Sequence, residues 1–133
     1  MVGVVVVDDQ APFRRAARAI LGATPGFALL AEADSGEQAV ALARSLEPDV
    51  ILMDIKMPGI GGIEATRLIT TARAATLVVL LSSYPERDLP ANARACGAAA
   101  YVAKEGFGRG VLERIWNARR TSASARTGTE APP

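Results

Sequence analysis

Three acidic residues, a serine and a lysine each follow a short apolar segment of the chain. Asp8 and Asp9 come directly after the first such segment, and Asp54 comes after a later one. Ser82 and Lys104 end two further segments in the same way. If these segments are parallel strands of a doubly wound sheet, their carboxyl ends meet at the edge where such sheets bind ligands. The sequence therefore predicts that the five side chains share one site.

The acidic residues of this predicted site indicate a divalent metal ion. Carboxylates brought close together repel one another and raise each other's pKa unless a cation lies among them. Mg²⁺ prefers oxygen ligands and is usually held by one or two carboxylates together with a phosphate oxygen. The chain has no His and a single Cys, which argues against zinc or copper. We therefore expect Asp8, Asp9 and Asp54 to surround Mg²⁺.

Lys104 and Ser82 would complete a site for a tetrahedral anion. A phosphoryl group in transfer spreads negative charge over three equatorial oxygens, which Mg²⁺, an ammonium and a hydroxyl can meet. One nucleophile is then needed. Asp54 is the candidate, because a carboxylate held in line can form an acyl phosphate. The predicted chemistry is phosphoryl transfer to Asp54.

Each of these features has a simpler interpretation when it is taken alone. An Asp-Asp pair or the pair Ser82-Ser83 after a strand is commonly a turn or a helix cap, and a single lysine is commonly a solvated charge. Their occurrence at the same end of successive strands favours the site. The only two lysines of the chain, Lys56 and Lys104, both lie in these loops, while every other cation is Arg.

Strand-length apolar segments that alternate with helical patterns would position these residues. The first and fourth segments carry no polar alternation, so each should be buried on both faces of a parallel sheet that is covered by helices on either side. Five such units make an α/β protein with a doubly wound parallel sheet. The predicted strands are Val2–Val7, Phe27–Ala31, Val50–Met53, Leu77–Leu81 and Ala99–Ala103.

Proline and glycine residues indicate the boundaries of the fourth and fifth helices. Pro90 cannot lie inside a helix, so the fourth helix should begin near Leu89-Pro90, with Asp88 as its cap, and end at Gly97. The fifth helix should follow the loop Gly106–Gly110.

Composition bounds the domain and its partners. The 133 residues, half of them hydrophobic, are enough for one core, and the net charge of +1 gives no basic surface for direct nucleic-acid binding. No apolar segment approaches the ~20 residues that span a bilayer, so we expect a soluble, cytoplasmic protein without membrane contact. Residues 1–120 should form the domain. Residues 121–133, rich in Thr, Ser, Ala and Pro, should be a disordered tail or the start of a linker.

The order and spacing of these residues resemble the receiver domain of a two-component response regulator. The match runs from about residue 2 to residue 118. The resemblance implies a three-layer (βα)5 flavodoxin-like fold with strand order 2-1-3-4-5. The matching pieces are Asp8-Asp9, the loop Asp54-Ile55-Lys56-Met57-Pro58-Gly59 followed by Gly62, then Ser82, and Tyr101-Val102-Ala103-Lys104.

The resemblance implies a role for each acidic residue. Asp54 would accept a phosphoryl group from a phosphohistidine of a sensor histidine kinase. Asp9, Asp54 and the backbone carbonyl of Lys56 would bind Mg²⁺, with Asp8 acting largely through water. The chain would then be a signalling domain, whose only reactions are its own phosphorylation and dephosphorylation.

The resemblance also implies how the signal leaves the site. Lys104 would contact the phosphoryl oxygen, and Ser82 with Tyr101 would form the switch pair. Phosphorylation would then change the face made by the fourth helix, the fifth strand and the fifth helix. Lys56 and Tyr84 would flank the path of attacking water, and we predict that they slow hydrolysis.

The finer likeness is to the NarL/LuxR-type subclass of transcriptional regulators. Asp8-Asp9-Gln10 with Arg14 downstream carries it, and so does Lys104 followed by Glu105 rather than by the Pro of many receivers. Gly61 stands where an Asp is common. The helix-turn-helix effector of the subclass is missing from this chain. A homodimer could form through helices one and five, anchored by Trp116, or through the helix 4/strand 5/helix 5 face.

Two other classes of function stay open from the residues. A haloacid-dehalogenase phosphatase would also use carboxylates and Mg²⁺, but its Asp-x-Asp nucleophile loop is not present, since Asp54 is followed by Ile55-Lys56. A phosphorylation-independent protein-interaction module is the better rival. Partner binding that survives Asp54→Asn would favour it.

Overall fold

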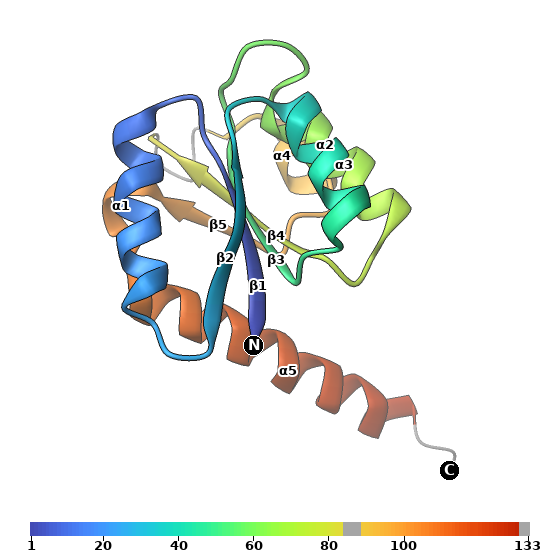
Figure 1. Ribbon diagram of the computed structural model, residues 1–133. Coiled ribbons are helices and arrows are strands. Elements are labelled where there is room, and N and C mark those ends of the chain that lie inside the picture. Colours follow the sequence, from blue (N-terminus) through green and yellow to red (C-terminus); the bar gives the residue numbers. More distant parts are fainter. Residues whose placement is uncertain (84–88, 131–133) are drawn as a thin grey trace.

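An open sheet with helices on both faces forms the body of the protein, as the computed structural model in Figure 1 shows. The model describes residues 1–83 and 89–130. The strands are β1 (Val2–Val7), β2 (Phe27–Ala33), β3 (Val50–Asp54), β4 (Leu77–Ser82) and β5 (Ala100–Ala103). The described helices are α1 (Ala11–Gly22), α2 (Gly36–Leu46), α3 (Gly61–Ala72), α4 (Ala91–Ala95), the short 3₁₀ helix η2 (Lys104–Gly106) and α5 (Arg109–Glu130).

The sheet has the predicted topology. All pairings are parallel, and the strand order is β2-β1-β3-β4-β5. The chain leaves β1 on one side toward β2 and returns on its other side as β3, so the strand order reverses between β1 and β3. Ligands bind at such a reversal in doubly wound sheets. The fold therefore places the carboxyl ends of β1 and β3 at the expected position of a site.

Alternate residues of each central strand face two separate cores. Val5, Ile51 and Val78 belong to the core beneath α2, α3 and α4. Their neighbours Val4 and Val50 belong to the core beneath α1 and α5. Figure 1 shows the same division of helices between the two faces of the sheet. Because both faces are covered, the central strands need apolar residues at every position, as the sequence pattern predicted.

The strand ends differ slightly from the predicted bounds. Asp54 is the last residue of β3 and Ser82 is the last residue of β4, whereas the sequence analysis placed both just outside their strands. The parallel ladder continues to that point, since Asp54 pairs with Leu81 and the Ile55 amide donates to the Leu81 carbonyl at 3.1 Å. The two polar residues are therefore held by sheet hydrogen bonds rather than by a loop.

Helix α4 is short and is bounded by proline and glycine, as expected. It begins at Ala91 with Pro90 at the N-cap position. Gly97, two residues past its end, has a φ of +98°, a conformation that favours glycine and stops a helix. Asp88, the predicted cap, lies outside the described residues.

Helix α5 is described as far as Glu130, and the disordered tail or linker expected from residue 121 stays a prediction. The helix extends beyond the sheet in Figure 1. The domain boundary at residue 120 stays a prediction. Among the residues that the structure describes, no helix combines the length and the apolar character needed to cross a membrane.

Candidate functional site

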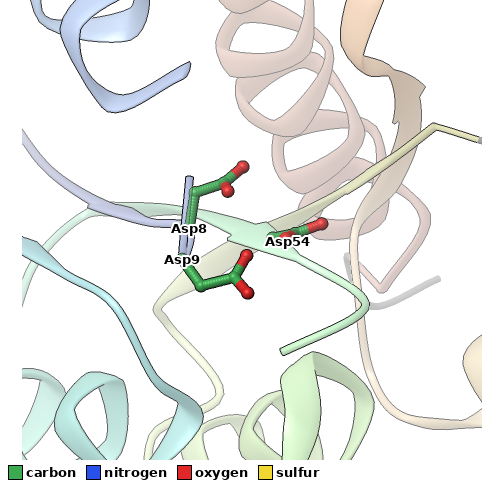
Figure 2. A group of neighbouring side chains, drawn as sticks. All are labelled: Asp8, Asp9 and Asp54. Atoms are coloured by element: carbon green, nitrogen blue, oxygen red, sulfur yellow. The ribbon is translucent and has the colours of Figure 1, made fainter. Parts of the chain in front are cut away.

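Three carboxylates gather where β1 and β3 end. Asp8 and Asp9 follow β1, Asp54 closes β3, and one oxygen of each lies within 4.8 Å of the other two. Figure 2 shows the three side chains extending to the same side of the strand ends. Asp8 and Asp54 are buried, whereas Asp9 is exposed. The register of the sheet causes this arrangement, because Val7 pairs with Met53 and the next residue of each strand is an Asp.

The Lys104 ammonium lies among these acids. Its Nζ is 2.6 Å from Asp8 Oδ2 and 3.3 Å from Asp54 Oδ1. Burial works to lower the pKa of Lys104, but the hydrogen bond to Asp8 and the charges of Asp54 and Asp8 outweigh it, so the pKa is raised. Lys104 is therefore a fixed positive charge that bridges the two buried carboxylates.

Ionisation of the acceptor candidate Asp54 is unfavourable in this site. Burial and the charge of Asp8 raise its pKa to about 6, although the charge and hydrogen bond of Lys104 act in the opposite direction. The exposed Asp9 adds a smaller increase. One ammonium thus does not neutralise the three acids, and a further cation at this point would lower the electrostatic cost of ionising Asp54.

Asp8 is held in place by backbone and side-chain hydrogen bonds. The Gln10 amide donates to Asp8 Oδ1 at 2.8 Å, a local turn that leads the chain from β1 into α1. Arg14 Nη1 donates to the backbone carbonyl of Asp8 at 2.6 Å, and Arg14 Nε lies 3.5 Å from Glu32 of β2. From the sequence, Arg14 is only a part of the family likeness. Arg14 lies one helical turn after Gln10, and helical side chains tilt toward the N-terminus of the helix. This spacing indicates that Arg14 points back toward the end of the strand.

Gly62 lets α3 approach the backbone of Asp54. Its amide donates to the Ile55 carbonyl at 2.9 Å. A Cβ at Gly62 would collide with the carbonyl oxygen of Asp54. The glycine predicted as part of the loop motif is thus required because the first turn of α3 rests on the end of β3.

The site opens into a pocket of about 210 Å³ at this edge of the sheet. Three of the predicted residues, Lys56, Ser82 and Lys104, line it beside the acids. Ser82 is buried, and Lys104 follows β5 directly. The described residues that line it are Asp9, Gln10, Asp54, Ile55, Lys56, Ser82, Ser83 and Lys104. Tyr84 lies outside the described residues, so its role in hydrolysis stays a prediction.

Tyr101, the other half of the predicted switch pair, contacts α4 and does not line the pocket. Its hydroxyl donates to the Ala93 carbonyl at 2.7 Å. The Thr70 hydroxyl of α3 donates to the Cys96 carbonyl at 3.1 Å, just after α4. The described side chains therefore place Ser82 at the site and Tyr101 at the neighbouring helix.

The donor set fits Mg²⁺. It offers three carboxylates and no nitrogen or sulfur ligand, which matches the preference of a hard cation for oxygen. Asp9 and Asp54 line the pocket, while Asp8 is already engaged by Lys104 and by the Gln10 amide. All three carboxylates form the group of oxygen donors that the described residues offer. The part assigned to the Lys56 carbonyl stays a prediction.

Comparison with known proteins gives the family. The model of the response regulator receiver domain matches residues 4–115. The response regulator GacA of Pseudomonas aeruginosa is 39% identical over 126 residues, which cover 95% of this chain and 58% of the relative. UvrY of Escherichia coli is 40% identical over 115 residues, covering 86% and 53%. The chain thus spans little more than half the length of these relatives.

A solved structure agrees with the sequence comparison. The signal receiver domain of the response regulator NarL from Mycobacterium tuberculosis superposes with a TM-score of 0.77 at 30% identity, covering 86% of this chain and 95% of that one. The NarL/LuxR-type likeness expected from the sequence is confirmed by these relatives. The topology, the acidic edge of the sheet and these matches lead to one conclusion: the chain belongs to the receiver domains of two-component response regulators.

Proposed function

We propose that Asp54 is the phosphoryl acceptor of this receiver domain and that a sensor histidine kinase is its donor. The observation that carries the proposal is the Lys104 ammonium between Asp8 and Asp54, at 2.6 and 3.3 Å, at the pocket that Ser82 also lines. That arrangement supplies a nucleophile, a fixed cation and a hydroxyl donor around one cavity. These are the parts that phosphoryl transfer uses.

In the transfer, an oxygen of Asp54 forms a bond to phosphorus while the phosphorus–nitrogen bond of the donor breaks. The imidazole nitrogen leaves with the bonding electron pair and takes up a proton. Lys104 and the Ser82 hydroxyl would donate to the phosphoryl oxygens as charge moves onto them. Mg²⁺ bound by Asp9 and Asp54, with Asp8 behind them, would neutralise further charge on these oxygens.

The signal would leave through β5 and α4. Phosphorylation adds nearly two negative charges at Asp54, which would draw the Ser82 hydroxyl inward. Tyr101 would then adjust on β5, and its bond to the Ala93 carbonyl would carry that change to α4. The receiver acts as a two-state element whose α4–β5–α5 face depends on local charge.

The output we propose is transcription control through an effector domain, by analogy with GacA and UvrY, which are named response regulators. Trp116 of α5 packs from the surface against the core beneath α1 and α5. It would anchor a homodimer through α1 and α5, with the α4–β5–α5 face as the other possible surface. This chain would contact protein partners rather than DNA.

Acetyl phosphate labelling tests the acceptor. We expect mass spectrometry to find one added phosphoryl group in the wild type with Mg²⁺, and none in Asp54→Asn. Asp34→Asn is the matched control, because Asp34 is an exposed aspartate after β2, away from the pocket. Labelling that persists in Asp54→Asn would show that another residue accepts the phosphoryl group.

A further inference from the structure

An aromatic ring lies beside the lysine of the site. Lys104 Nζ is 5.1 Å from the centroid of the Phe13 ring, within the range of a cation–π interaction. Phe13 belongs to the first turn of α1, whereas Lys104 follows β5, so the contact joins opposite ends of the chain. Phe13 does not line the pocket, and its contact with Lys104 links it to the site.

The ring itself is held by the core rather than by the charges of the site. Phe13 packs against Phe107, with ring centroids 6.2 Å apart and planes tilted by 49°. Both rings pack against the core beneath α1 and α5. The Phe13 ring is therefore held by apolar contacts as well as by its contact with the ammonium.

Lys104 needs such a fixed contact. It stands at the start of the short 3₁₀ helix η2, which has no side-chain cap hydrogen bond, and its side chain has four rotatable bonds. Its charged partners are not constant, because the charge on Asp54 changes with metal binding and phosphorylation. Asp8 lies 2.6 Å from the ammonium and Asp54 lies 3.3 Å from it, so a change of charge on Asp54 would alter the balance between these two attractions. The ring attracts the ammonium whatever the charge on Asp54.

We propose that Phe13 is a positioning residue, whose ring face keeps the Lys104 ammonium within reach of the phosphoryl group on Asp54. The proposal rests on the function proposed above. Phe13 does not line the pocket and would act on the reaction through its contact with the lysine. Loss of the ring face should therefore slow phosphoryl transfer while metal binding is kept.

Phe13→Leu, Phe13→Tyr and Phe27→Leu separate this role from simple packing. Leu keeps an apolar side chain but has no π face, whereas Tyr keeps the face. Phe27→Leu is the matched control. Phe27 packs against the same core but is the first residue of β2, whereas the site lies at the carboxyl ends of the strands. We expect Phe13→Leu to lower the acetyl phosphate labelling rate at saturating Mg²⁺ by about two- to fivefold, the factor that a cation–π contact corresponds to.

Lysine NMR reports the contact directly. Lys56 and Lys104 are the only lysines, so a protein labelled at lysine Cε gives two signals. The Lys104 Hε protons should be shifted upfield by the Phe13 ring current in the wild type and in Phe13→Tyr. They should return toward the Lys56 position in Phe13→Leu. This measurement needs no phosphorylation, so it stands even if Asp54 is not the acceptor.

The labelling rate, the Mg²⁺ affinity and the Lys104 signal together decide whether Phe13 positions the lysine. Slower labelling in Phe13→Leu, with wild-type Mg²⁺ affinity and recovery in Phe13→Tyr, supports the proposal. Equal rates in Phe13→Leu and Phe27→Leu overturn it, and so does a Mg²⁺ affinity that falls along with the rate, because that would show displaced strand ends. If Phe13→Leu does not fold, a wild-type Lys104 signal without an upfield shift still overturns it. A wild type that shows the shift but takes no label refutes the proposed function and leaves the contact itself established.

Discussion

At the level of single residues, burial of the acids at the site lowers the stability of the metal-free protein. Asp54 is buried near Asp8, and the Lys104 ammonium cannot neutralise both carboxylates together with Asp9. The pKa of Asp54 is consequently raised to about 6, and the main cause is burial. An ionised Asp54 therefore costs the metal-free protein stability, and that cost is the reason a cation should bind here.

Asp54→Asn should stabilise the metal-free protein above pH 6. The folded pKa of about 6 exceeds the reference value of 3.8, so the wild type is most stable with Asp54 protonated and loses stability as pH rises from about 4 through 6. The amide of Asn avoids this loss. We expect a gain of about 1–2 kcal/mol at pH 7.5, after allowance for solvent screening.

Urea unfolding at pH 4.5 and 7.5 without metal measures this effect. The advantage of Asp54→Asn over the wild type should shrink at the lower pH, where the wild-type carboxyl is protonated. Added Mg²⁺ should narrow the difference at pH 7.5 by stabilising the wild type, and less so below pH 6. An advantage equal at both pH values would contradict an electrostatic origin.

At the level of elements, the site depends on how closely helices approach strand ends. Gly62→Ala would place a methyl group against the Asp54 carbonyl, which is backbone and cannot rotate away. The first turn of α3 would have to shift, at a cost of about 1–3 kcal/mol. Gly22→Ala is the control, because a Cβ there meets nothing within 4 Å and alanine favours the helix.

Denaturant unfolding and Mg²⁺ titration of the two glycine variants test this geometry. Gly62→Ala should lose both stability and metal affinity, whereas Gly22→Ala should keep or slightly gain stability. A Gly62→Ala protein that matches the wild type in both measurements would show that α3 does not constrain Asp54.

The hydrogen bond between Tyr101 and α4 allows a second prediction at this level. Tyr101→Phe keeps the ring but removes the donor to the Ala93 carbonyl. We expect a loss of about 1 kcal/mol and faster amide hydrogen exchange in α4, because this short helix has no side-chain cap. Exchange in α1 should not change. Unchanged exchange in α4 would mean that the hydroxyl does not hold the helix.

At the level of the whole molecule, the two cores are complete before the end of α5. Leu112 is the last fully buried residue of α5 among the described side chains, and Trp116 lies at the edge of the same core. The free energy of unfolding of a protein that ends at Arg120 should therefore lie within about 0.5 kcal/mol of that of the full chain. Its acetyl phosphate labelling should be unchanged. A loss of several kcal/mol would place the domain boundary beyond residue 120.

The amino-acid sequence by itself determined the fold class and the identity of the acids. Unbroken apolar segments such as Val4–Val7 indicate strands buried on both faces, and an acid directly after such a strand must lie at its carboxyl end. Asp8, Asp9 and Asp54 could therefore be assigned from local pattern. The order of the strands and the switch role of Ser82 and Tyr101 came from the resemblance to receiver domains, which supplies what a local pattern lacks.

Only the tertiary structure decided which partner each charged group contacts. Lys104 lies nearer to Asp8 than to Asp54, Arg14 donates to the Asp8 carbonyl, and the Phe13 ring lies beside the ammonium. These contacts join residues far apart in the chain, and they depend on how α1 and η2 pack around the end of the sheet. A periodic sequence pattern records which face of an element is buried, but distances of a few ångströms between elements arise only when the packed core fixes their positions.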